Sequence, residues 1–213
     1  MTIQVPNGAV VSIASTYGAA KVMSAITSAN PAVATLAPAH GIVVNDILEV
    51  TSGWSKLNSR IAKASVVATN DVTLAGINAS SVTAYPAGAG VGTVRAITAW
   101  TQLAQILSSA SEGGDQQFQT YQFLESDSEF RIPTVKSAQG LKFSVGDDPA
   151  SAGQILAQAA NDDKVARAVR IALPGGGMLY YNAFITVGQP TLNQNEIMAV
   201  EVTLSLIAAV TRY

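Results

Sequence analysis

The residue types that carry most enzyme chemistry are scarce in this chain of 213 residues. His40 is the single histidine, and there is no cysteine. A serine–histidine–aspartate arrangement would have to use His40, and a zinc site would need several histidine or cysteine ligands. His40 stands in the turn-like sequence Ala-Pro-Ala-His-Gly-Ile, where its ring is expected to bond to nearby backbone. We therefore predict a protein that is not an enzyme and has no cofactor.

One group of carboxylates could still bind a cation. Glu125, Asp127 and Glu129 alternate along the chain, so on a strand they would share one face, as calcium ligands can. Serines separate them, and no glycine of a calcium loop follows. The pattern therefore favours a solvated loop without a metal, and the sequence leaves calcium binding between Glu125 and Glu129 open.

The composition is unusually poor in charge. Only 12% of the residues are charged, against roughly 25% in ordinary soluble domains. The apolar run Leu204–Val210 is far shorter than the ~20 residues that cross a bilayer, and the first basic residue is Lys21, too late for a secretory signal. A net charge of -2 without a basic cluster argues against binding nucleic-acid phosphates. A surface with so little charge is most simply explained if other protein subunits cover it. We therefore predict that the chain is a subunit of an assembly.

Short strands separated by turns fill the stretch from Val22 to Ile97. Apolar alternation and β-branched runs indicate strands, and Gly, Asn, Asp and Pro mark the turns between them. The expected strands lie at 47–51, 62–67, 72–74 and 92–97. Many short strands with frequent turns favour a small barrel, and we expect such a β-barrel-like module in the N-terminal half.

Beyond Ile97 the pattern stays β-rich. A stretch rich in Ser and Gly, 108–114, is expected to be a loop. Strand patterns lie at 116–124, 130–136, 141–145, 169–173, 179–187 and 198–206. In the last strand the even-numbered residues are apolar, whereas the other face carries Ala199, Glu201, Thr203 and Ser205. The predicted fold class is mainly β, a sandwich or barrel with one packed α-helix.

One helix is expected between these strands. Asp148 is placed to cap it, Pro149 fits its first turn, and it is expected to end near Asn161. A helix between antiparallel strands is expected to pack on one side of the sheet. Its apolar face would contain Ala152, Ile155, Leu156, Ala159 and Ala160.

The order of several segments resembles a known family. The sequences at 114–118 (GDQQF), 120–125 (TYQFLE), 132–139 (IPTVKSAQ) and 200–206 (VEVTLSL) are similar to tail tube, or major tail, proteins of long-tailed, non-contractile bacteriophages (siphophages). Those at 30–33 (NPAV), 49–54 (EVTSGW) and 85–88 (YPAG) resemble a small β module of some phage virion proteins. The resemblance implies a tail tube core, residues 1–21 and 98–213, that carries an inserted β module, residues 22–97.

This resemblance implies a structural protein of the virion tail, made in the host cytoplasm. Family members form hexameric rings that stack into a hollow tube. The tube surrounds the tape measure protein and conducts DNA during ejection without binding it specifically. The implied partners are further copies of the chain, the tape measure protein, and the tail terminator and distal tail proteins, with no membrane involved.

Two surfaces can be assigned to such an assembly as hypotheses. Glu201, Thr203 and Ser205 could line the lumen, where an acidic wall would repel DNA phosphates; an exposed outer strand explains them equally well. The Ser- and Gly-rich loop could order against the next ring on stacking, and the alternative is a plain flexible loop. Its residues would be Ser108, Ser109, Ser111, Glu112, Gly113, Gly114, Asp115, Gln116 and Gln117.

A carbohydrate-binding or adhesin module of a virion or cell surface is the competing interpretation. β-sandwiches commonly serve in this way, and Trp54, Tyr85 and Trp100 could stack on sugars. The aromatic residues are few and scattered, which favours the tube subunit. The two interpretations differ in self-association: a tube subunit associates without ligand, whereas a binding module stays monomeric and responds to glycans.

Overall fold

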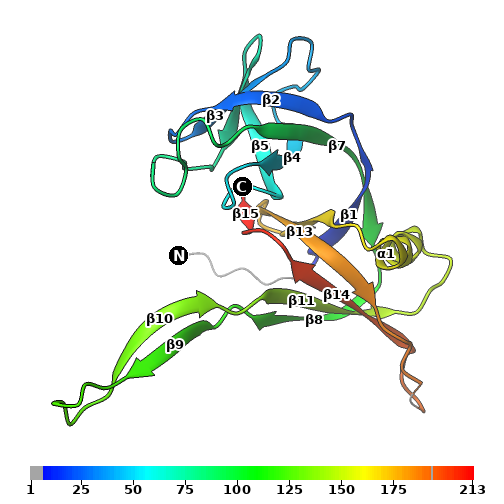
Figure 1. The fold of residues 1–213 in the computed structure, drawn as a ribbon. Helices are drawn as coiled ribbons and strands as arrows, with labels where there is room; N and C mark the ends of the chain where they lie inside the picture. The colour runs from blue at the N-terminus through cyan, green and yellow to red at the C-terminus, as the bar shows by residue number, and fades with distance from the viewer. Residues whose placement is uncertain (1–6, 193) are drawn as a thin grey trace.

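The chain folds almost entirely into antiparallel strands (Figure 1). The structure is a computed structural model that describes residues 7–192 and 194–213, and within them it has one helix, α1 (Ala152–Asp163). The predicted class, mainly β with one packed helix, is confirmed. Residues 1–6, which the sequence assigned to the tail tube core, lie outside the described residues.

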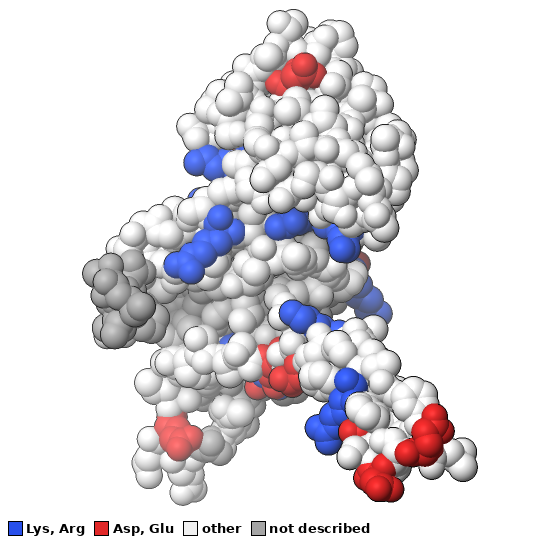
Figure 2. All heavy atoms as spheres, turned by 90° about the vertical axis from the view of Figure 1, so that its left-hand side faces the viewer, with Lys and Arg blue, Asp and Glu red and all other residues white. Residues whose placement is uncertain are grey.

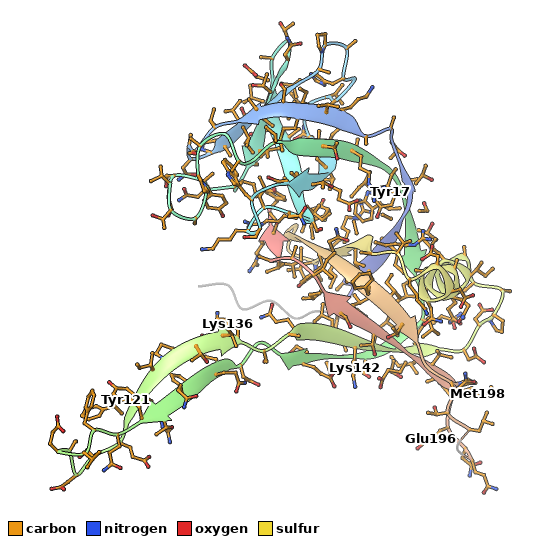
Figure 3. The ribbon with its side chains drawn as sticks, viewed as in Figure 1. Tyr17, Tyr121, Lys136, Lys142, Glu196 and Met198 are labelled. Carbon is orange, nitrogen blue, oxygen red and sulfur yellow. The ribbon has the colours of Figure 1, made fainter. Side chains whose placement is uncertain are left out.

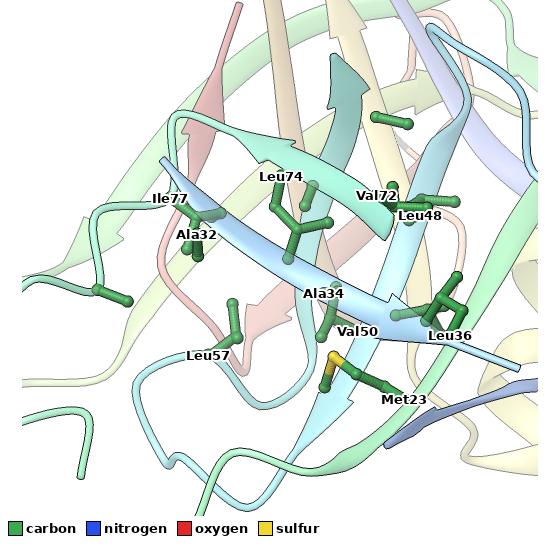
Figure 4. Packing of buried hydrophobic residues seen from close by; sticks show 14 of the residues in the cluster. Met23, Ala32, Ala34, Leu36, Leu48, Val50, Leu57, Val72, Leu74 and Ile77 are labelled. Carbon is green, nitrogen blue, oxygen red and sulfur yellow. The ribbon is translucent and has the colours of Figure 1, made fainter. Parts of the chain in front are cut away.

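A small closed barrel forms one end of the molecule (Figure 1). Strands pair in the order β2–β3–β6–β5–β4–β7, and β7 pairs again with β2, so the sheet closes on itself and leaves no free edge. The buried side chains of Met23, Leu48 and Leu74 meet inside it (Figure 4). Its strands are β2 (Lys21–Ile26), β3 (Ala32–Leu36), β4 (Ile47–Ser52), β5 (Arg60–Val67), β6 (Asp71–Ala75) and β7 (Gly92–Leu103).

Strand β7 continues out of the barrel into a second, open sheet. The order there is β7–β1–β12–β13–β14–β11–β8, and the short β15 (Thr211–Arg212) pairs with β13. The sequence-based division between residues 97 and 98 falls inside β7, so one strand serves both parts, and the division stays a prediction. The remaining strands are β1 (Val10–Tyr17), β8 (Ile106–Gly113), β11 (Gln139–Gly146), β12 (Arg167–Ala172), β13 (Met178–Val187) and β14 (Ala199–Leu206).

Helix α1 covers one face of the open sheet, with only part of the apolar face that the sequence predicted. Gly153, Ala157 and Ala160 are buried, whereas Ile155 is 57% exposed. The reason is close packing: a Cβ on Gly153 would lie 2.3 Å from the carbonyl oxygen of Gln102 on β7. Small residues must therefore face the sheet at this point. The predicted apolar face is correct for Ala160 and for the partly buried Leu156, and wrong for Ala152, Ile155 and Ala159, which are exposed.

The ends of α1 also differ from the prediction. The N-cap is Ser151, not Asp148, and the helix continues to Asp163. Asp148 instead accepts a hydrogen bond from the backbone N–H of Ala150, at 3.2 Å, just before the helix. Pro149 therefore lies ahead of the first turn, in a short turn that the aspartate stabilises.

Two tyrosine hydroxyls bond to backbone groups that lie far away in the sequence. The Tyr213 hydroxyl donates to the carbonyl oxygen of Ala75 and accepts from the backbone N–H of Lys63, both at 2.8 Å. The Tyr17 hydroxyl accepts from the backbone N–H of Ala168 at 2.9 Å. These contacts link residues that are more than 100 positions apart in sequence. The bonds of Tyr213, which follows β15, tie the barrel to the open sheet, whereas the bond of Tyr17 lies within the open sheet, between β1 and β12.

These two tyrosines predict a loss of stability in alkali. Burial raises the pKa of Tyr17 and of Tyr213 above the ordinary value of 10.0. The unfolded chain then releases these protons at lower pH than the folded chain, so stability is complete below pH 10 and falls as pH rises further. Urea unfolding between pH 8 and about 11 should show this fall.

The variant Tyr213→Phe tests the cause of that fall. It removes one phenol with a raised pKa and the hydrogen bond to Ala75. The free energy of unfolding should fall by about 1 kcal/mol at neutral pH. Its stability should also fall less steeply above pH 10 than that of the unmodified chain. Equal slopes for the two proteins would contradict the role assigned to the Tyr213 hydroxyl.

Candidate assembly surfaces

The described residues cover the open sheet on one face only. Val200, Val202 and Leu204 of β14 are buried on the side of α1. Within the described residues, no helix or second sheet packs against the opposite face of β8, β11 and β14. Among the residues that the structure describes, that face has no packing partner.

Small and polar side chains make up this bare face. Cross-strand register places Lys142 between Ala110 and Thr203, and Ser144 between Ser108 and Glu201. Directly paired residues share a face of an antiparallel sheet, so Glu201, Thr203 and Ser205 lie together, as the alternation predicted. We call this surface the polar face: Ser108, Ala110, Glu112, Gly140, Lys142, Ser144, Glu201, Thr203 and Ser205.

Three charged groups lie together on the polar face. The Lys142 ammonium is 2.7 Å from a carboxylate oxygen of Glu112 and 3.4 Å from one of Glu201. These hydrogen bonds, first that to Glu112, raise the pKa of Lys142. Figure 3 shows Lys142 on β11. Two carboxylates and one ammonium leave the group with a net charge of -1. The sequence interpretation missed Lys142, although its position between Leu141 and Phe143 marks it as facing away from the core.

The stretch expected to be a stacking loop is mostly strand. Ser108, Ser109, Ser111, Glu112 and Gly113 belong to β8, which pairs with β11, and Gln116 and Gln117 begin β9 (Gln116–Tyr121). Only Gly114 and Asp115 connect the two strands. The loop prediction is wrong because pairing with β11 overrides the weak β-propensity of serine and glycine.

Strands β9 and β10 (Phe130–Lys136) form a projecting ribbon, which we call the arm (Figure 1). Among the described strands they pair only with each other, and every residue of β10 is exposed. Apolar side chains are included: Phe118 is 56% exposed and Ile132 52%. A lone two-stranded ribbon is marginally stable in water, so a surface like this is completed by other protein. The strand patterns were predicted, but not that these strands leave the body of the molecule.

The tip of the arm contains an aromatic cluster and the three alternating carboxylates. The ring centroids of Tyr121 and Phe123 are 5.3 Å apart, and those of Tyr121 and Phe130 are 5.6 Å apart. Glu125 and Asp127 belong to the connection between the strands. In the described part of the chain, no group of His, Cys, Asp or Glu is arranged to hold a metal ion. The tip of the arm therefore combines an aromatic cluster with acidic side chains.

The single histidine has a structural role. The Nδ1 atom of His40 accepts a hydrogen bond from the backbone N–H of Ile42 at 3.0 Å, and the side chain is buried. This contact confirms the turn interpretation. It also occupies the ring nitrogen that a catalytic arrangement would need.

Two of the three aromatic residues assigned to sugar stacking lie in the barrel core. Trp54 is 2% exposed and Tyr85 is 8% exposed, with ring centroids 5.2 Å apart in an edge-on pair. The Trp54 Nε1–H donates to the carbonyl oxygen of Pro86 at 2.8 Å. Rings packed in this way present no face to a ligand. The carbohydrate-binding interpretation therefore rests on Trp100 alone, over which Arg170 lies at 4.8 Å.

A bare polar sheet face and an exposed arm define a class of protein: a β-rich subunit whose surface is completed by other subunits. A family model described as phage tail tube protein, TTP, matches residues 52–213. The chain therefore belongs to the phage tail tube protein family, and it is a structural component of the virion tail. No curated protein matches it. No helix among the described residues is long and apolar enough to span a membrane.

Solved structures of tube systems show a weak similarity. A sheath/tube terminator of an extracellular contractile injection system is 18% identical, with a TM-score of 0.36 over 51% of this chain and 84% of that one. A sheath–tube complex of such a system is 17% identical, with a TM-score of 0.34 over 49% and 78%. An anti-feeding prophage tube terminating cap is 21% identical, with a TM-score of 0.34 over 49% and 78%. These TM-scores are too low to support any conclusion about function.

Proposed function

We propose that this chain polymerises as stacked hexameric rings into the hollow tail tube of a non-contractile phage. The tube surrounds the tape measure protein during assembly and conducts DNA during ejection. The tail terminator and distal tail proteins bind its two ends. The observation that carries this proposal is the open sheet with α1 on one face and nothing described on the other. Such a sheet suits the wall of a tube, with α1 outside and the polar face toward the lumen.

The chemistry of the polar face supports a lumen through which DNA slides. Apart from Glu112, Lys142 and Glu201 its residues are small, and they include no aromatic ring on which a base could stack. Glu112, Lys142 and Glu201 contribute one net negative charge per subunit. A ring of such subunits repels phosphates, and its one kind of cation, Lys142, is already paired with carboxylates. The Lys142 bridge fixes the carboxylate side chains along the wall.

A lumen charge reversal tests this proposal. Tubes of Glu112→Lys/Glu201→Lys, assembled with short duplex DNA, should retain nuclease-protected DNA at low salt and release it as salt rises. Unmodified tubes should retain none. The matched control is Asp71→Lys/Asp162→Lys, which makes the same charge change outside the polar face and should give no protection.

Two results would contradict the proposal. One is an unmodified chain that stays monomeric in sedimentation and negative-stain microscopy at every concentration, with or without glycans. The other is a polar-face variant whose tubes protect no more DNA than the control, because its cations would then lie outside the lumen.

A further inference from the structure

A hollow of ≈ 520 Å³ lies between the barrel and the root of the arm. We call it the waist hollow. Its apolar lining includes Tyr85, Leu206 and Ile207, and its cations are Lys56, Arg60 and Lys136. No acidic residue is among the described residues that line it. The hollow therefore combines apolar and cationic side chains, and we call Lys56, Arg60 and Lys136 its rim cations and the apolar lining its floor.

Among the described residues, the cations of the waist hollow form no ion pair. Within residues 7–192 and 194–213, the ion pairs at 4.0 Å or less involve Arg95, Lys142 and Arg167, and none of the three rim cations. The Nε atom of Arg60 is buried and makes no hydrogen bond among the described atoms. An incoming carboxylate would be attracted to the exposed ammonium groups of Lys56 and Lys136 beside it.

The arm tip has the complementary chemistry. It carries Glu125, Asp127 and Glu129 beside the aromatic cluster, and Leu124 at the same end is fully exposed. None of these three carboxylates takes part in an ion pair among the described residues. Figure 2 shows Lys and Arg side chains in a band across the middle of the molecule and Asp and Glu side chains near the end of the projection at lower right.

The two surfaces of one chain do not meet. Lys136 stands at the root of the arm, and Tyr121 lies near its other end (Figure 3). The seven residues of β10 separate root and tip by roughly 20 Å of extended strand. The tip of one arm can therefore fill the waist hollow of another copy only.

We propose that the acidic, aromatic tip of the arm docks in the waist hollow of a second copy of this chain. The aromatic cluster covers the apolar floor, and the carboxylates reach Lys56, Arg60 and Lys136. Because tip and hollow are different surfaces, each copy both gives and receives a contact, and such a contact propagates into rings or stacks. This inference rests on the proposed tube function and assigns one of its subunit contacts.

Charge exchange tests the docking. The tip variant is Glu125→Lys/Asp127→Lys/Glu129→Lys, and the waist variant is Lys56→Glu/Lys136→Glu, which leaves the partly buried Arg60 unchanged. Each alone should raise the concentration needed for polymerisation at least ~10-fold. A chain that carries both sets, or an equimolar mixture of the two variants, should regain polymerisation. The control Lys21→Glu/Lys164→Glu matches the charge change of the waist variant and should polymerise normally.

A cross-link gives a direct second measurement. The chain has no cysteine, so Asp127→Cys with Lys56→Cys introduces one defined pair. Oxidation should give ladders of disulfide-linked copies, whereas Asp127→Cys with Lys21→Cys should not. Normal polymerisation of the tip variant and of the waist variant, together with no ladder from Asp127→Cys/Lys56→Cys, would overturn the docking. The proposed tube function would be unaffected by that result. An unmodified chain that never polymerises would instead overturn the tube function.

Discussion

A chain whose arm is replaced by an Asn-Gly turn between Gln116 and Lys136 is expected to fold normally and to lose polymerisation. Gln116 and Lys136 pair directly, and a two-residue Asn-Gly turn closes such a pair. The deleted residues, 117–135, supply nothing to the hydrophobic clusters, so the free energy of unfolding should change by about 0.5 kcal/mol or less. Urea unfolding measures the first result, and sedimentation velocity with negative-stain microscopy measures the second.

The control for the arm deletion removes exposed apolar surface elsewhere. Val66 and Val82 are 58% and 67% exposed and lie in the barrel half of the chain. Val66→Ser/Val82→Ser should therefore polymerise like the unmodified chain. Tubes of normal length from the arm-deleted chain would show that the arm is not an assembly contact.

Replacement of Trp54 should cause the largest loss of stability. Trp54→Ala removes a side chain that is 2% exposed, and changes of this kind cost about 3–5 kcal/mol. It also leaves the carbonyl oxygen of Pro86 without its donor. Gly90 approaches the ring so closely that a Cβ there would lie 2.6 Å from it. The backbone at Gly90 therefore packs directly against the Trp54 ring and would lose this contact in the variant. Urea unfolding followed by circular dichroism measures the effect.

Trp100→Ala is the matched control, because Trp100 is only partly buried. It should cost clearly less than Trp54→Ala. A loss below about 1 kcal/mol for Trp54→Ala would mean that the ring is not packed in the barrel core. That result would make Trp54 available for sugar stacking again, and glycan binding would then need to be measured.

The sequence predicted the elements whose signal is local. The alternation through β14 predicted which side chains are buried and which lie on the polar face, because the period of a half-buried strand is two residues. Turn residues predicted the short strands of the barrel. The prediction that His40 is a turn residue whose ring bonds to nearby backbone was also correct, because its bond to Ile42 spans only two residues.

Long-range pairing determined the features that the sequence did not predict. The sequence of Ser108–Gly113 predicted a loop. The segment is a strand because it pairs with β11, which lies more than 25 residues later in the chain. Gly153 and Ala157 face the sheet because β7 approaches the helix closely, which no pattern within the helix reveals. The arm was recognisable as two strands, but its separation from the body depends on the absence of a third pairing strand.

The most direct test of the tube account is an electron cryomicroscopy structure of the polymer that the purified chain forms. The account predicts a hollow tube of stacked rings in which β8, β11 and β14 line the lumen, α1 lies outside, and Glu201 faces solvent at the tube wall. A polymer in which neighbouring subunits bury Glu201, or in which the polar face lies on the outside, would contradict it.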